Sequence, residues 1–549
     1  MPSASGTHPG AWTAPRPTFA VTIVTALIVV FTAAFLDPGP GRPSEAETFA
    51  RTEATPVVVA SSPEHPPSLS PPPPRPHVPP EPAEASAAVP LSGRERALLE
   101  SLDPDLFASL PPRAGAWEEG ERPPCFADDA SASRRCLPDY HVVGAWQSGG
   151  QAFNAKLEAH PDVHEGAAPH FWNEPDKPTT RYLDLFSARA AEETEAEGKN
   201  NKSNVLRVGD ASPGVLANTW TESQRMHRSF AQTAAACWQA CQELSDAPIQ
   251  GASRTPRRRC VDGDGDGGGG GCVSRAAARD AVVNGSFLLT ATADRSPRST
   301  PLSVPHLMRH AYGEKSVKII ALVRAPLARL RAAFAHYAHY AKAFGEGEDG
   351  FDAFVATFVD EFQRCEADAR RRNESRDANV SRTFSARTEC AFHFEALGPD
   401  REKVFYHCDQ LIKTMYGTFA RGWVEAFGAA NVLFLRTEDA FSSSATVRKR
   451  ALNRATHFLG LHVGATDDVI QRMDACDETS GCVRGGDATL ATLDFGEGVA
   501  ATRAATRERV DAFFEPETTI LAELFGDRDE ASSWAAWGRG EATEVGVKV

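Results

Sequence analysis

The pattern of apolar and polar residues is most informative between residues 318 and 340. Ile319–Val323 is a short apolar run, long enough for a buried strand and too short for most helices. Arg324 follows at once, and Pro326 suits the first turn of a helix, where a backbone N–H has no partner. The apolar side of the helix-like segment that follows holds Leu327, Leu330, Phe334, Tyr337 and Tyr340. This pattern predicts a strand, an arginine at its carboxyl edge and a helix. In an open α/β sheet that edge binds ligands, and arginine suits a phosphate, although an ion pair capping the edge is the alternative.

A second strand, loop and helix of the same kind lies upstream. His141–Gly144 is the predicted strand, Ala145–Gln151 is a loop of mostly small and polar residues, and Ala152–His160 is the predicted helix. A loop of this kind before a helix N-terminus leaves backbone N–H groups free to hold an anion. The pair Gly149-Gly150 is also typical of a simple turn. The GxxxxGK[ST] motif of nucleotide triphosphatases is absent from the sequence.

The hydropathy of the N-terminal residues predicts a membrane anchor. Thr18–Leu36 is an uncharged apolar stretch, long enough to cross a hydrocarbon core of ~30 Å, so residues 1–17 are interpreted as a cytoplasmic tail. A cleaved signal peptide is the alternative, although its apolar region is usually shorter. Residues 37–91 are rich in Pro, Ala, Ser and Glu and are predicted to form a disordered stem. Ser92 and Glu95 then predict a capping box at the start of a short helix.

The net charge of the chain narrows the classes of macromolecule that it can bind. The formal net charge of −15 argues against nucleic acid and gives no broad basic surface for a polyanionic glycosaminoglycan. A neutral or lightly charged glycan therefore suits the chain better. The basic runs Arg370–Arg372 and Arg448–Arg450 are interpreted as solvated helix faces. The oligomeric state is not predicted.

The cysteines and glycosylation sequons favour a compartment of the secretory pathway. Eleven cysteines are present, and such a compartment would allow disulfides. Cys260–Cys272 and Cys476–Cys482 are candidate local pairs, and Cys365–Cys390 is a further candidate. The odd number leaves at least one cysteine unpaired within the chain. The Asn-x-Ser sequons, which agree with a luminal domain, begin at Asn201, Asn284, Asn373 and Asn379.

Residues 221–300 are interpreted as a low-complexity insertion. Asp and Gly alternate over Asp262–Gly267, and glycines continue to Gly271. A calcium loop of the DxDxDG kind requires glutamate at its twelfth position, where Val273 stands. The metal-binding DxD of a Golgi glycosyltransferase normally ends an apolar strand, which is missing here. We therefore interpret the segment as a flexible surface loop and predict no metal site.

Together, the two strand–loop–helix segments resemble the sulfotransferases that use 3′-phosphoadenosine-5′-phosphosulfate (PAPS). They are most similar to the Golgi carbohydrate sulfotransferases of the N-acetylgalactosamine 4-sulfate 6-O-sulfotransferase type. The residues that carry the resemblance follow one another along the chain as Cys136–Tyr140, His160–Val163, Gly209–Pro213 (GDASP), Leu411–Phe427, Val432–Asp439, Phe458–Leu461 and Phe513–Leu524 with Trp534. The resemblance implies an α/β sulfotransferase fold over residues 125–534, with a P-loop-like parallel sheet flanked by helices. It also implies PAPS as sulfate donor, a glycan acceptor, and a single-pass type II protein of the Golgi membrane with its domain in the lumen.

The resemblance further assigns roles to single positions. The first loop is expected to hold the 5′-phosphosulfate and Arg324 the 3′-phosphate, so the cofactor-binding candidates are Gln147, Ser148, Gly149, Gly150, Gln151 and Arg324. The chain departs from the family at positions that carry the chemistry. Gln147 stands where a lysine is expected, Gly150 and Gln151 replace two threonines, and Ala332 replaces a serine.

The expected general base is also replaced. Residues 167–172 align with the KEPHxW segment of the family, and Ala168 stands at the glutamate. Loss of a charged stabiliser or of a general base typically costs ~10²–10⁴-fold in rate. The candidate replacement bases are His170, Glu165 and Glu174, and the candidate sources of charge are Arg324, Arg329 and Arg331.

Three functional hypotheses stay open from the sequence. The first is a sulfotransferase that moves sulfate from PAPS to a glycan hydroxyl in the Golgi lumen. The second is a catalytically degraded protein that keeps the sulfotransferase fold and binds glycan or a partner. The third is a metal-dependent glycosyltransferase that uses Asp262 and Asp264.

Overall fold

The computed structural model describes a single α/β unit within Pro79–Val549. The described residues are 87–111, 124–128, 133–173, 178–188, 207–217, 240–241, 244, 260, 298–313, 315–374, 384–395, 409–462, 468–476, 497–526, 534 and 537. The central sheet has the order β4-β3-β5-β6, and all of its strands are parallel. Its strands are β3 (Tyr140–Gly144), β4 (Gly209–Asp210), β5 (Lys318–Val323) and β6 (Val432–Arg436). The parallel sheet and the strands predicted at 141–144 and 319–323 are therefore present, and β6 lies in the segment 432–439 that carries part of the resemblance.

The strand order reverses between β3 and β5. After β3 the chain adds β4 on one side of it, and then adds β5 and β6 on the other side. Side chains of β5 point alternately to the two faces, as the period of two in a strand requires. Ile320 and Leu322 pack in one core cluster, whereas Ile319, Ala321 and Val323 pack in the other. Both faces of the sheet are therefore buried, which explains the continuous apolar run in the sequence.

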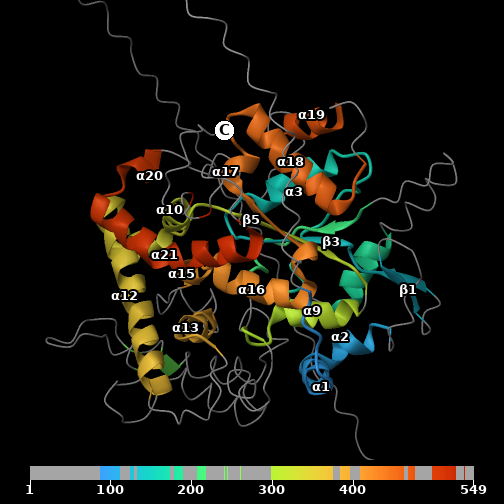
Figure 1. Cartoon of the computed structure of the whole chain (residues 1–549), viewed down its shortest axis with the longest axis horizontal. Coiled ribbons are helices and arrows are strands. Elements are labelled where there is room, and N and C mark those ends of the chain that lie inside the picture. The colour runs from blue at the N-terminus through green and yellow to red at the C-terminus, as the bar shows by residue number, and fades with distance from the viewer. Residues whose placement is uncertain are drawn as a thin grey trace, which may run out of the picture. The chain divides into compact units, whose positions relative to one another are not determined.

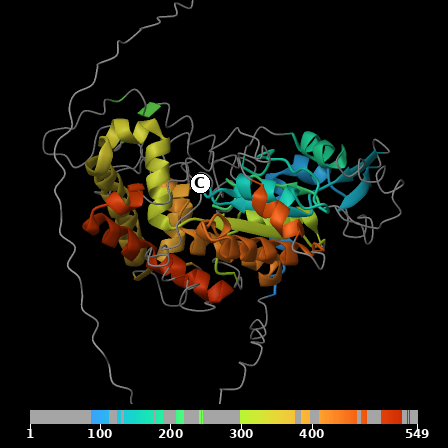
Figure 2. The same cartoon turned by 90° about the horizontal axis from the view of Figure 1, so that it is seen from above.

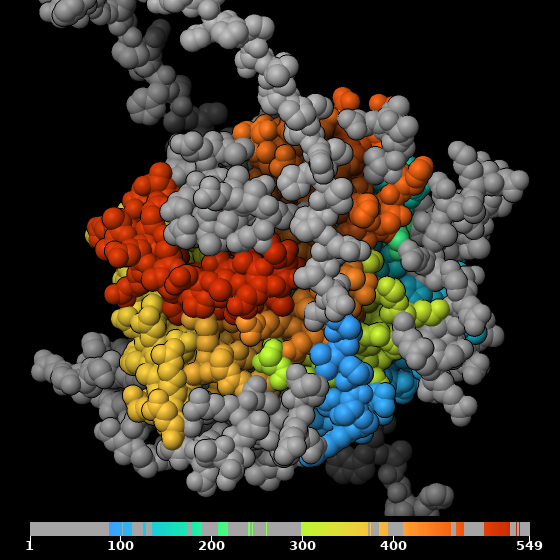
Figure 3. Space-filling view, in the orientation of Figure 1, coloured from blue at the N-terminus to red at the C-terminus, as the bar shows by residue number. Residues whose placement is uncertain are grey.

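Helices cover the two faces of the sheet (Figure 1). One layer holds α3 (Gly150–Glu158), α18 (Ala445–Leu459) and α19 (Asp468–Ala475), and the other holds α9 (Val304–Tyr312) and α16 (Tyr416–Phe427). A second group of helices lies beside the sheet, as the view from above shows (Figure 2). This group comprises α10 (Pro326–His336), α11 (Ala338–Phe344), α12 (Gly347–Glu374), α13 (Ala386–Glu395), α20 (Glu497–Ala501) and α21 (Ala504–Phe525). In the space-filling view α21, in red, packs against both α12 in yellow and α16 in orange (Figure 3).

The smaller elements surround these layers. They are α1 (Gly93–Leu102), α2 (Pro104–Ala108), the antiparallel pair β1 (Cys125–Asp128) and β2 (Ser133–Cys136), α15 (Asp409–Ile412), the 3₁₀ turn η2 (Ala429–Asn431) and α17 (Thr437–Ala440). The predicted capping box at α1 is confirmed, because Ser92 and Glu95 bond to each other's backbone N–H groups. The helix predicted through Tyr340 is instead two helices, since Tyr337 has an extended backbone between α10 and α11. Its hydroxyl accepts a hydrogen bond from Trp146, a tertiary contact that the apolar pattern does not reveal.

The predicted fold class needs one correction, which concerns the transmembrane helix placed before the domain. Among the helices that the structure describes, none is long and apolar enough to cross a membrane. The fold class is therefore corrected to the α/β domain alone. The predicted span Thr18–Leu36 and most of the predicted stem lie outside the described residues, as do Asp262–Gly271 and most of the predicted insertion.

Disulfides connect several of the outer elements. The candidate pair Cys365–Cys390 is confirmed and joins α12 to α13. The candidate pair Cys260–Cys272 is wrong, because Cys260 is bonded to Cys241. A further disulfide, Cys125–Cys136, closes the β1–β2 pair. Cys476 is also disulfide-bonded, and its predicted partner Cys482 lies outside the described residues.

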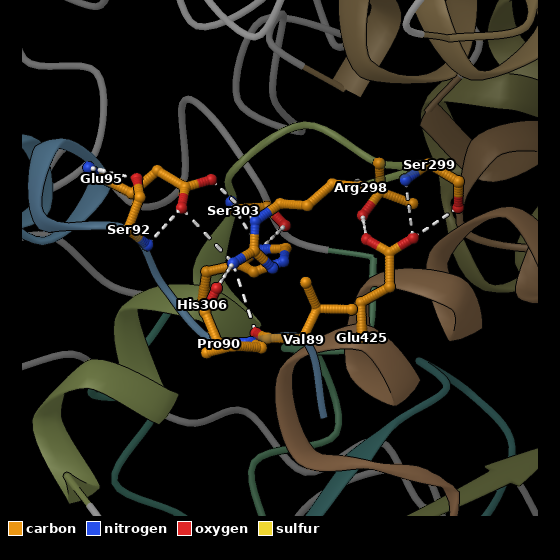
Figure 4. Close-up of polar contacts among 10 residues, drawn as sticks. Val89, Pro90, Ser92, Glu95, Arg298, Ser299, Ser303, His306 and Glu425 are labelled. Atoms are coloured by element: carbon orange, nitrogen blue, oxygen red, sulfur yellow. Dashed lines mark hydrogen bonds and ion pairs between the residues drawn. The ribbon is translucent and has the colours of Figure 1, made fainter. Parts of the chain in front are cut away.

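Buried polar groups fix the segment that leads into α1 (Figure 4). Arg298 donates to Glu95 at 2.7 Å and to the carbonyl oxygen of Pro90 at 2.9 Å. Glu425 on α16 accepts from the backbone N–H of Ser299 at 2.8 Å. His306 is buried beside this cluster, and its Nδ1 accepts from the N–H of Ser303 at the start of α9. Burial, followed by the nearby charge of Arg298, lowers the pKa of His306 to about 3, although Glu95 acts in the opposite direction.

Acidification is therefore expected to destabilise the domain through His306. The unfolded chain binds a proton on this ring near pH 6.5, whereas the folded ring stays neutral until about pH 3. Because the unfolded state binds more protons, the free energy of unfolding falls as the pH drops below 6.5, by about 2 kcal/mol between pH 6.5 and 5. Urea denaturation of the wild type and of His306→Gln at both pH values checks this, since glutamine keeps the capping acceptor and does not titrate. Equal pH dependence of the two proteins would contradict the assignment.

Candidate functional site

The candidate site lies at the carboxyl ends of β3 and β5, where the strand order reverses. The first loop, Ala145–Gly149, follows β3, and Arg324 follows β5. The first loop contacts the end of β5, because the N–H of Ala145 donates to the carbonyl oxygen of Leu322. The Thr437 hydroxyl lies 2.7 Å from the carbonyl oxygen of Ser148 and 3.1 Å from that of Val323. The fold thus brings the two predicted cofactor-binding segments to one place.

The first loop has the backbone of an anion-binding turn. Gln147 and Gly149 both have left-handed backbones, with φ of 60° and 78°. Helix α3 begins at Gly150, two residues before the predicted start, and has no side-chain cap. The first N–H groups of a helix have no partner within the helix and bind anions well. Gly150 itself is buried, and a Cβ added there would lie 3.3 Å from Pro213, so this position must stay small.

Gln147 brings no charge to this loop. Its side-chain oxygen is buried and has no hydrogen-bond partner among the residues that the structure describes. That oxygen is an acceptor, whereas a phosphate requires donors. The loop therefore fits the binding of a phosphate through its backbone, but it lacks the cation that would neutralise a leaving group.

Arg324 is fully buried at the end of β5 and has a carboxylate close to it. Glu438, in α17, interacts electrostatically with Arg324 and accepts hydrogen bonds from the N–H of Ala325 and from Trp537, each at 2.8 Å. Burial raises the pKa of Glu438, while these hydrogen bonds and Arg324 act against the rise. Glu438 therefore contributes negative charge near Arg324, and the ion pair considered from the sequence as an alternative stays a hypothesis. The phosphate role of Arg324 stays a prediction.

The two other arginines proposed as sources of charge have structural contacts. Arg329 is buried and donates to the carbonyl oxygen of Trp146 at 3.1 Å, to the carbonyl oxygen of Gln410 at 2.8 Å and to its side chain at 3.0 Å. Arg329 therefore holds the backbone of the first loop at Trp146. Arg331 pairs with Glu348 and lies over the ring of Phe351. Arg331 is therefore held against α12, in the group of helices beside the sheet.

The candidate bases are in different places. His170 lies beside the first loop, with its ring 6.5 Å from that of Trp146. Its Nδ1 is 3.4 Å from the side-chain nitrogen of Asn173, and the tautomer of the ring decides which ring nitrogen is an acceptor. Glu165 is exposed, in the segment that runs along the outer side of β4. Glu174 lies outside the described residues.

A buried polar network holds the segment that carries His170. His170 has a left-handed backbone, with φ of 55°, and its N–H donates to the Ser212 hydroxyl at 3.0 Å. That hydroxyl lies 2.5 Å from Asp210, which also accepts from Tyr182 at 2.9 Å and has His141 within 3.6 Å. Burial and the charge of Asp210 raise the pKa of Tyr182 well above its ordinary value, so the phenol stays a donor. The sequence showed the GDASP segment only as a resemblance, and it gave no sign of these partners.

No metal-binding group is found in the described part of the chain. None of its His, Cys, Asp and Glu side chains form a cluster of three or more placed to hold an ion. Asp262 and Asp264 lie outside that part. The glycosyltransferase hypothesis therefore gains no support from the site.

Comparisons with known proteins give few matches. No family model matches the chain, and no curated protein sequence matches it. Among solved structures, a sulfotransferase from Alicyclobacillus acidocaldarius is similar at 14% identity and a TM-score of 0.28, covering 73% of this chain and 99% of that chain. A TM-score and an identity this low do not show that the two proteins have the same fold.

Proposed function

We propose that the chain is a sulfotransferase-like protein that binds a 3′-phosphoadenosine nucleotide between the ends of β3 and β5. The observation that carries the proposal is that the first loop and Arg324 follow the two strands between which the order reverses. Ligands of open parallel sheets bind outside the carboxyl ends of the strands at this point. The uncapped start of α3 suits a phosphate group, and the order of motifs along the chain favours PAPS.

The proposed reaction is transfer of sulfate to a glycan hydroxyl. PAPS supplies an activated sulfuryl group when it is bound. The N–H groups at the start of α3 would hold its 5′-phosphate, and His170 is the candidate to accept the proton of the hydroxyl, through whichever ring nitrogen is free. Because Gln147 brings no positive charge to the leaving group, we propose that transfer is slow.

A non-catalytic protein that retains the fold is the second candidate. The observation that favours it is that both arginines already interact with other residues of the protein. Arg324 interacts electrostatically with Glu438, and Arg329 donates hydrogen bonds to Trp146 and Gln410. Such a protein would still bind a nucleotide or a glycan. The disulfides Cys125–Cys136, Cys241–Cys260 and Cys365–Cys390 favour an oxidising secretory compartment under either proposal.

Calorimetric titration with 3′-phosphoadenosine-5′-phosphate, the product of PAPS, tests the proposal. We expect micromolar binding by the wild type. Gln147→Lys should bind about tenfold more tightly and raise sulfate transfer, because a charged donor then faces the phosphate. Gln147→Met, which has a similar size and no charge, should show neither gain. Absence of binding by the folded protein would contradict the proposal, and an unchanged affinity of Gln147→Lys would refute the explanation by charge alone.

A further inference from the structure

The outer side of α18 carries a groove that is separate from the candidate site. The groove has a volume of about 860 Å³ and runs from Thr446, in the first turn of the helix, to Phe458, in its last. Its basic lining consists of Lys449, Arg450, Arg454 and His457. Its apolar lining consists of Leu433 on β6, Phe458 and Ile470 on α19. A volume of this size lies within the usual range of ligand-binding clefts.

The charge of the groove differs from that of the protein. The whole chain has a formal net charge of −15, yet α18 contains no Asp or Glu. Arg448 is neutralised by Asp474 at 2.7 Å, whereas no carboxylate of the described residues lies within ion-pair distance of Lys449 or Arg450. Asp468, in the first turn of α19, is close in sequence to Ile470 but does not line the groove. Lys318 lies next to the groove without lining it: its ammonium is 4.8 Å from the ring of Phe458 and donates to Ala430 and Asn431.

The combination of an apolar lining and a basic rim selects among anionic partners. A sulfated glycan or a single-stranded nucleic acid has charges for the rim, but a glycan has no apolar side chains to cover Leu433 and Phe458, the partly exposed apolar residues of the lining. A nucleic acid would require aromatic rings on which its bases stack, and among the described lining residues Phe458 is the only Phe, Tyr or Trp, with Lys318 already over its ring and His457 as the one further ring. A peptide that alternates acidic and large apolar side chains satisfies both parts of the groove. Apolar anchors supply affinity, and complementary charges supply orientation and specificity.

We propose that this groove is a docking site for an acidic peptide segment with Leu, Ile or Phe anchors, contributed by a partner protein. The basic run Arg448–Arg450, which the sequence suggested is only a solvated helix face, thereby acquires a function. Docking does not depend on nucleotide binding, because the groove includes no residue of the candidate site. Loss of one activity would therefore leave the other in place.

Selection from a random twelve-residue peptide library displayed on phage, against the full chain, tests the proposal. We expect enriched peptides to combine Asp or Glu with Leu, Ile or Phe. Synthetic copies should bind at least tenfold more weakly to Lys449→Glu/Arg450→Glu than to the wild type. The matched control Arg364→Glu/Arg371→Glu makes the same change of charge on the exposed side of α12 and should bind as the wild type does. Thermal denaturation shows whether each variant is folded.

Two further measurements separate the possible partners. Replacing the apolar anchors of a selected peptide by serine should weaken binding at least tenfold, and raising the salt concentration should weaken binding of the parent peptide. Enriched peptides without acidic residues would overturn the proposal, as would unchanged binding to the folded Lys449→Glu/Arg450→Glu variant. A heparin oligosaccharide or single-stranded DNA that displaces the selected peptide at an equal or lower concentration would overturn the choice of a peptide partner.

Discussion

Replacing Glu438 by alanine is expected to lower the free energy of unfolding by about 2–4 kcal/mol, because the change removes the shared acceptor of two hydrogen-bonded donors. Glu438 is half-buried, and its carboxylate accepts from the N–H of Ala325 and from the indole of Trp537 and interacts electrostatically with Arg324. Alanine would leave these two donors without an acceptor and would remove a negative charge that acts on the buried guanidinium of Arg324. Urea denaturation, followed by circular dichroism, measures the change. Arg371→Met, which removes an exposed ion pair with Asp368, is the control and should cost less than about 1 kcal/mol.

A double-mutant cycle then decides what Arg324 does. Arg324→Met and Glu438→Gln keep the approximate shapes of the side chains and remove their charges. If the two groups stabilise each other, the double variant should be more stable than the sum of the single changes predicts, by about 1–3 kcal/mol. If Arg324 also binds the 3′-phosphate, Arg324→Met should weaken 3′-phosphoadenosine-5′-phosphate binding far more than Glu438→Gln does. Additive stabilities would contradict the pairing, and equal effects on nucleotide binding would contradict the phosphate role.

Local patterns in the sequence were sufficient to predict the elements that frame the site. The apolar run at Ile319–Val323 marks β5 because both faces of that strand are covered, and Pro326 marks the start of α10. Neighbouring parallel strands end at the same edge, so the first loop and Arg324 were expected to meet there. These features depend on residues close together in the chain, which is why they can be read from it.

The partners of the site residues depend on contacts between distant segments. Glu438 comes near Ala325 and Arg324 because β6 pairs with β5, and Arg329 on α10 reaches the carbonyl oxygen of Trp146 in the first loop. The wrong cysteine pair has the same origin, since Cys260–Cys272 is the shorter loop but folding brings Cys241 to Cys260. Sequence spacing carries no information about such distances. The prediction of a charged phosphate-binding arginine was therefore incomplete without its counter-charge.

The second large effect is expected at Asp210, whose replacement by alanine should cost about 3–5 kcal/mol of stability. The carboxylate is buried and holds Ser212 at 2.5 Å and Tyr182 at 2.9 Å, with His141 at 3.6 Å. Alanine would leave these buried polar groups without their shared acceptor, and each such group costs about 1–3 kcal/mol. Asp210→Asn should cost less, because an amide keeps the shape and one acceptor oxygen.

The position of His170 makes the same substitution informative about the site. Ser212 accepts the N–H of His170, whose left-handed backbone needs support from its surroundings. We expect the Asp210→Asn protein to stay folded. The imidazole resonances of His170 should shift in its NMR spectra, because the contact of the ring with Asn173 changes. Asp184→Asn, at an exposed ion pair with Arg135, is the control and should leave both stability and these resonances unchanged. If Asp210→Asn left His170 unperturbed, the network would stabilise the fold without positioning the histidine. If Asp210→Asn lowered the stability and also shifted the His170 resonances, the buried carboxylate would link the stability of the sheet edge to the geometry of the candidate base.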